Sequence, residues 1–161
     1  MRQTWADVPW ISVMDPEVTT TQQTGYYVVY LFSVDMKTVS LSLNQGITFL
    51  NDELGQKKAM QELSRRASFI RDRVSEYKNL FSDAGLDLAS NLSKSHRPKL
   101  YEPGHAFGSV YETNNLPDED KLSQTVDAAN NFIAMAMGGR VAEILVFDEI
   151  SSGAAQDIEV A

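Results

Sequence analysis

The chain has 161 residues, 43% of them hydrophobic, which suits one soluble domain with an appendage. The absence of cysteine excludes disulfides, thiolate metal sites and cysteine nucleophiles, and no apolar run approaches the roughly 20 residues that cross a membrane. Net charge is −8, yet residues 1–115 hold 12 basic and 13 acidic side chains, whereas residues 116–161 hold 2 and 9. The near-neutral first part can still bind DNA through a local basic patch, weakly and with strong salt dependence. Since no signal peptide is visible, we expect a cytoplasmic protein without a membrane partner.

Strand patterns dominate the first fifty residues. Residues 10–14 alternate in side-chain type and predict a short strand, which Asp15-Pro16 ends. Gly25 opens the strongest strand signal of the chain, residues 26–34, which are rich in aromatic and β-branched side chains.

A turn at residues 35–37 joins that strand to a second one at residues 38–43. In this second strand apolar residues alternate with Thr38, Ser40 and Ser42. The alternation predicts an antiparallel hairpin with one buried face and one polar face.

A long helix is predicted from about residue 50 to residue 81, with a break or weak turn at Gly55. Its apolar residues recur at steps of three and four: Leu63, Ala67, Ile70, Val74, Tyr77 and Phe81. The opposite face carries basic residues interspersed with acids and is interpreted as a solvated surface with ion pairs.

The second half begins with a polar connector, residues 83–95. The densest basic cluster follows at residues 94–99, and residues 106–111 predict another strand. Asn114 to Asp120 has a polar cap candidate, an early proline and acids, which favours a helix start. His96 and His105 are interpreted as solvated loop histidines.

The aromatic blocks resemble a known family, the N-terminal DNA-recognition domain of McrB-like modification-dependent restriction systems, over residues 5–132. The resemblance implies an α+β domain with a curved sheet, joined to an AAA+ GTPase that recruits a nuclease. It also implies that the domain reads DNA, as the McrB prototype does by flipping a methylated cytosine into an aromatic pocket. Five blocks match in order: Val8-Pro9-Trp10-Ile11, Gly25-Tyr26-Tyr27, Tyr30-Leu31-Phe32, Leu41 to Gly46, and Val110-Tyr111 to Asn115-Leu116-Pro117.

Carried over motif by motif, the resemblance places the base pocket at Trp10, Tyr27 and Leu31, with Tyr101 as a further wall. A flipped base needs flat apolar walls on which to stack. Trp10, Leu31 and Tyr27 also suit an ordinary sheet core, and that alternative stays open.

The basic cluster supplies the candidate contacts to the DNA backbone, Lys94, Arg97 and Lys99. A plain solvated surface is the alternative for these residues. The chain has no GxxxxGK[ST] motif, so the motor and the nuclease are expected in other parts of a larger system.

The carboxyl-terminal residues 137–161 resemble a different family, the peptidase domain of FtsH-type zinc proteases. The matching residues are Gly138-Gly139-Arg140 to Phe147 and Ile150 to Ile158. In that family the aspartate at the position of Asp157 completes a zinc site whose two histidines lie on an HExxH helix. That motif is absent, so we expect no metal site unless another chain completes one around Asp157.

The sequence therefore predicts an α+β fold: a curved, largely antiparallel sheet, a long helix packed on it, and a helical carboxyl-terminal segment. We expect a DNA-recognition domain at residues 1–133 and an FtsH-like segment at residues 134–161. The expected function is recognition of a modified or flipped base in double-stranded DNA, without enzymatic activity or cofactor. An inactive fragment or subunit of an FtsH-type protease and a protein-interaction domain are the alternatives.

Overall fold

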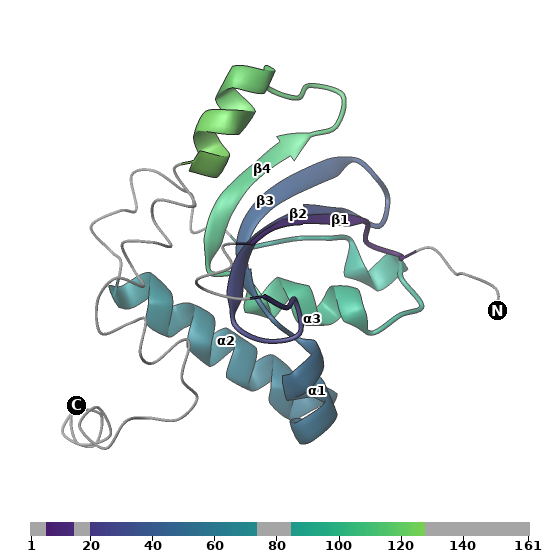
Figure 1. Ribbon diagram of the computed structural model, residues 1–161. Helices are drawn as coiled ribbons and strands as arrows, with labels where there is room; N and C mark the ends of the chain where they lie inside the picture. Colours follow the sequence, from purple (N-terminus) through teal and green to yellow (C-terminus); the bar gives the residue numbers. More distant parts are fainter. Residues whose placement is uncertain (1–5, 15–19, 74–84, 128–161) are drawn as a thin grey trace.

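The computed structural model describes residues 6–14, 20–73 and 85–127. Within them, one antiparallel sheet has the strand order β1-β2-β3-β4. Figure 1 shows this sheet curving above α2 and α3, which confirms the α+β class with a long helix packed on the sheet. The elements are β1 (Trp10–Val13), β2 (Tyr26–Phe32), β3 (Thr38–Gln45), α1 (Thr48–Leu54), α2 (Gln56–Arg73), the 3-10 helix η2 (Ser90–Leu92), α3 (Arg97–Gly104) and β4 (Phe107–Glu112).

Both faces of the central strands are buried. On one face, Tyr27, Val29 and Leu31 of β2 form a core cluster with Val8, Leu86 and Leu88. On the other face, the exposed fraction is 0% for Val28 and 1% for Leu41. Continuous burial of this kind accounts for the run of aromatic and β-branched residues in β2.

The structure corrects the expectation that one face of the hairpin is polar and faces solvent. Ser40 and Ser42 are 1% and 0% exposed, so these hydroxyls lie inside the protein rather than in solvent. The reason is that the segment predicted as a polar connector covers this face: Leu86 and Leu88 pack into the core cluster. Period-two alternation reports which residues share a face, but it does not report what covers that face.

The helical prediction is confirmed in its main features. The helix is interrupted at Gly55, where α1 ends. The φ of Gly55 is 73°, a left-handed conformation that glycine adopts readily. Leu63, Ala67 and Ile70 of α2 are buried, as the spacing predicted. Val74, Tyr77 and Phe81 lie outside the described residues.

Helix α3 was not predicted. It holds Pro98 in its first turn, Pro103 within it and Gly104 at its end, residues that normally argue against a helix. Buried amides fix it in place: Asn44 Nδ2 donates to the Tyr101 carbonyl at 3.0 Å, and Gln45 Nε2 donates to the Gly104 carbonyl at 3.2 Å. Tertiary hydrogen bonds therefore outweigh the low helix propensity.

The last described residues, 119–127, are helical, which agrees with the predicted helix start. The predicted domain boundary at residues 133 and 134, the helical carboxyl-terminal segment and Asp157 lie outside the described residues. Among the described helices, none has the length and apolar composition that a membrane span requires.

A substitution at Gly108 of β4 tests the close contact between β3 and β4. A Cβ at this position would lie 1.9 Å from the Leu41 carbonyl oxygen, whereas a Cβ on Gly85 meets nothing within 4 Å. We expect Gly108→Ala to lower the free energy of unfolding by ~3 kcal/mol, because the backbone of the pair must separate. Gly85→Ala is the control and should change it by less than ~0.5 kcal/mol. Equal stabilities in urea unfolding would contradict this strand pairing.

Candidate nucleic-acid interface

Two predicted site residues, Trp10 and Leu31, lie near the turn from β2 to β3. Strand β1 begins there with Trp10, because the Phe32 amide donates to the Pro9 carbonyl at 2.9 Å. The amide of Val34 donates to the Leu88 carbonyl at 2.9 Å and brings the segment before η2 to the same place. Figure 1 shows the β2–β3 turn, the start of β1 and η2 on one side of the molecule.

The four predicted pocket residues lie on one side of the sheet. Trp10 and Leu31 are direct partners across β1 and β2, so their side chains point to the same face, which Tyr27 shares. Tyr101 of α3 packs against the core cluster that contains Tyr27 and Leu31. The fold thus places residues that are up to 91 positions apart in the chain on the same side of the sheet.

Exposure separates these four residues into two kinds. Trp10 is 43% exposed, whereas Tyr27 and Leu31 are 5% and 0% exposed. Trp10 therefore offers its indole to solvent, whereas Tyr27 and Leu31 are members of the core cluster. The assignment of all four to a base pocket stays a prediction.

Both tyrosines are neutral phenols at physiological pH. Burial raises the pKa of Tyr27, and the neighbouring Tyr101 raises it further. Burial also raises the pKa of Tyr101, although the Arg97 guanidinium opposes part of that shift. A neutral phenol provides a flat apolar face together with a hydroxyl that donates or accepts a hydrogen bond.

The predicted backbone contacts occupy the loop before α3 and its first turn. Lys94 and Arg97 are exposed, and Lys99 is partly buried. The Arg97 guanidinium lies near Tyr101, one helical turn further along, and acts to lower the pKa of its phenol. One helix thus carries both a candidate phosphate contact and a candidate pocket wall.

A carboxylate joins the basic loop to the strand that carries Trp10. Asp7 Oδ2 accepts hydrogen bonds from Ser93 Oγ at 2.5 Å and from the Ser95 amide at 3.3 Å. The Ser95 amide also donates to Ser93 Oγ at 2.9 Å. We call this group, Asp7 with Ser93 and Ser95, the Asp7 clasp. It holds the loop of Lys94 close to a residue three positions before Trp10, and no local sequence pattern predicted it.

The two histidines differ in their surroundings. His96 is exposed, as predicted, but His105 is 5% exposed, so its predicted solvation is wrong. Its Nδ1 lies 2.7 Å from Ser42 Oγ, to which Asn44 Nδ2 also donates at 3.2 Å. The short segment between α3 and β4 brings His105 under the sheet, where polar side chains of β3 receive it.

Within the described residues, no group of three or more histidine, aspartate or glutamate side chains could hold a metal ion.

Comparison with known proteins identifies the family. The family model described as "MrcB-like, N-terminal domain" matches residues 2–132. The chain belongs to this family. The match confirms the resemblance that the aromatic blocks carry, and its range nearly coincides with the expected one. No solved structure matches this chain.

The chain is also similar to part of several curated FtsH proteins. The chain is 38% identical over 121 residues to the ATP-dependent zinc metalloprotease FtsH of Pelodictyon phaeoclathratiforme, a match covering 71% of this chain and 17% of that protein. It is 31% identical over 120 residues to FtsH 4 of Sorangium cellulosum, covering 71% and 18%. It is 36% identical over 112 residues to FtsH of Myxococcus xanthus, covering 66% and 17%.

The chain thus spans less than a fifth of the length of these relatives. A match of 121 residues is much longer than residues 134–161, so the similarity to FtsH proteins reaches into the part that the MrcB-like model also matches. The expected likeness to part of an FtsH protein is confirmed, and it extends further toward the amino end than residue 137.

The Asp7 clasp can be tested without DNA. Asp7→Ala removes the acceptor of Ser93 Oγ and one of the two acceptors of the Ser95 amide, so the loop is held less firmly. We expect the Ser95 amide to exchange its hydrogen about tenfold faster and the protein to lose ~1 kcal/mol of stability. Asp7→Asn keeps an acceptor oxygen and should preserve most of the protection. Unchanged exchange of the Ser95 amide together with unchanged stability in Asp7→Ala would show that the clasp does not form in solution.

Proposed function

We propose that this chain is the DNA-recognition module of a modification-dependent, McrB-like restriction system, and that it reads a modified or flipped base. Membership of the MrcB-like N-terminal domain family supports the proposal. The module has no enzymatic role of its own. Its partners are double-stranded DNA and, in a larger system, an AAA+ GTPase motor with a nuclease subunit.

The observation that carries the proposal is the position of one exposed indole beside exposed cations. Trp10 is 43% exposed, and the Asp7 clasp ties its strand to the loop of Lys94 and to the start of α3, where Arg97 lies. Stacking of a base on an aromatic ring is worth ~1–3 kcal/mol, and cations position the phosphates. A reader of flipped bases needs these two kinds of contact side by side.

In this proposal each pocket residue has a distinct role. Trp10 is the stacking surface for the extruded base, and Leu31, its cross-strand partner, forms an apolar floor together with Tyr27. Tyr101 approaches from α3 and offers a neutral hydroxyl to the edge of the base. Extrusion costs a few kcal/mol, which stacking offsets in part.

The similarity to FtsH proteins favours a second candidate function, an inactive fragment or subunit of an ATP-dependent zinc metalloprotease assembly. In that case Asp157 becomes a zinc ligand only where another chain supplies the histidines. Zinc content and casein cleavage by an assembled complex test this candidate. A difference between methylated and unmethylated duplexes in a salt series supports the DNA-reading function instead. A protein-interaction domain is the outcome left when both tests are negative.

Trp10→Ala tests the stacking role. We expect it to weaken binding to the recognised duplex by ~1–3 kcal/mol, because the base loses its stacking partner, with little change in stability. Ile11→Ala is the matched control: Ile11 is the neighbouring residue, 59% exposed, and points to the opposite face of the sheet. Fluorescence anisotropy measures both affinities, and equal losses in the two variants would argue against a specific role for Trp10.

Arg97→Ala tests the phosphate contact. We expect lower affinity for every duplex and a salt dependence whose slope decreases by roughly 0.9, because one fewer phosphate is neutralised. Lys58→Ala removes an exposed cation from α2 instead and should leave the slope unchanged. A change in base preference in Arg97→Ala would be inconsistent with a contact to phosphate alone.

A further inference from the structure

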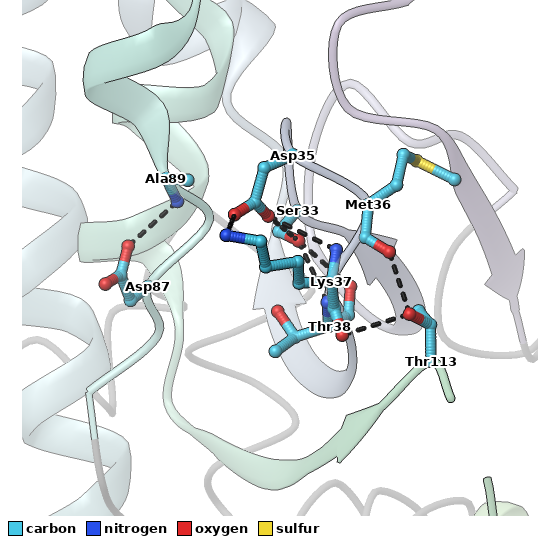
Figure 2. Close-up of polar contacts among 8 residues, drawn as sticks. All are labelled: Ser33, Asp35, Met36, Lys37, Thr38, Asp87, Ala89 and Thr113. Carbon is cyan, nitrogen blue, oxygen red and sulfur yellow. Dashed lines mark hydrogen bonds and ion pairs between the residues drawn. The ribbon is translucent and has the colours of Figure 1, made fainter. Parts of the chain in front are cut away.

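The turn between β2 and β3, residues 33–37, presents an apolar side chain at its tip. Met36 is 51% exposed and has a φ of 60°, a left-handed conformation that favours glycine or asparagine over a residue with a long side chain. The turn is drawn in Figure 2, where the Met36 side chain points away from the polar contacts that surround its backbone.

Polar groups inside the turn fix its shape. Asp35 Oδ1 accepts hydrogen bonds from Ser33 Oγ at 2.8 Å and from the Lys37 amide at 3.2 Å. The Thr38 amide donates to Ser33 Oγ at 3.0 Å, and the Met36 amide donates to the Ser33 carbonyl at 2.9 Å. These contacts determine the backbone conformation on both sides of Met36.

Neighbouring segments hold the turn from outside. Thr113, which follows β4, donates from Oγ1 to the Met36 carbonyl at 2.8 Å and from its amide to the Lys37 carbonyl at 2.9 Å. On the other side, the Val34 amide donates to the Leu88 carbonyl at 2.9 Å. The tip is therefore rigid before any partner binds, so insertion into a partner costs little ordering entropy.

The charges of the turn confine any contact with DNA to its tip. Lys37 Nζ lies 3.2 Å from Asp35 Oδ2, so these two charges compensate each other. Asp87 and Glu112 are exposed on the flanking segments and repel phosphates. A narrow apolar tip without net charge suits insertion between bases better than it suits a phosphate contact.

We propose that Met36 is a wedge that enters the base stack and fills the gap left by the extruded base. Methionine belongs to the apolar residues that proteins insert between base steps. The location fits: Trp10 opposes Leu31, and the turn begins two residues later at Ser33, so the turn starts roughly 7 Å along the strand from the stacking surface at 3.3 Å per residue. This inference rests on the proposed DNA-reading function and adds a second contact to it.

The experiment uses the full chain and separates binding from extrusion. A panel of duplexes with unmodified cytosine, 5-methylcytosine, 5-hydroxymethylcytosine or N6-methyladenine is screened by anisotropy. In the best-bound duplex, 2-aminopurine is placed beside the modified base, and its fluorescence rises when stacking is lost. The variants are Met36→Gly, which suits the left-handed backbone and so keeps the fold, Met36→Leu, which keeps an apolar wedge, and Leu54→Ala, which removes a 41% exposed apolar side chain from α1, away from the turn in Figure 1.

We expect Met36→Gly to lose most of the fluorescence rise and to bind about tenfold more weakly, while Met36→Leu and Leu54→Ala behave like the wild type. A full fluorescence rise in Met36→Gly overturns the wedge while leaving the DNA-reading function intact. So does a wild-type protein that binds the duplex without any rise, or a loss in Leu54→Ala as large as that in Met36→Gly. A wild-type protein that binds no duplex of the panel overturns both proposals.

Discussion

The buried amides at the end of β3 are the constraint on which the rest of the candidate interface depends. Asn44 and Gln45 are 0% and 2% exposed, and their side chains donate to the carbonyls of Tyr101, Gly104 and Leu63. A buried amide without partners is costly, so α2 and α3 are held at fixed positions on β3. The position of α3 in turn determines where Tyr101 and Arg97 lie.

The close fit at this junction leaves no space for an added side chain. A Cβ on Gly104 would lie 2.6 Å from Asn44 Oδ1, which also accepts the Gln45 amide at 2.9 Å. Glycine at the end of α3 therefore serves the approach of helix to strand, since its φ lies outside the left-handed region. The same junction places His105 Nδ1 within hydrogen-bond distance of Ser42 Oγ. One short segment therefore fixes both the end of α3 and a buried hydrogen bond to β3.

Local patterns in the sequence predicted the strands, the break at Gly55 and the apolar stripe of α2, because each depends on residues that are near one another in the chain. The elements that the sequence did not reveal depend on distant partners. Helix α3 contains two prolines and forms against β3. The Asp7 clasp joins Asp7 to Ser93 and Ser95, which lie 86 and 88 positions further along the chain. Burial of Ser40 and Ser42 depends on a covering segment that the polar composition of residues 83–95 concealed. For the candidate site, the sequence does not reveal that Trp10 is exposed while Tyr27 and Leu31 are buried, because exposure depends on the same distant covering segments.

Exposure changes how a recognition site on this fold can work. In the proposed function, a base stacks on the exposed Trp10 while Tyr27 and Leu31 stay in the core cluster, so the protein side needs little rearrangement. Binding energy is then available for extruding the base rather than for ordering the protein. A preorganised surface of this kind would discriminate between bases through the fit of small substituents, because closely packed residues do not adapt to an extra methyl group. The proposed wedge would act on the DNA side in the same way, since filling the vacated position in the stack would stabilise the extruded state.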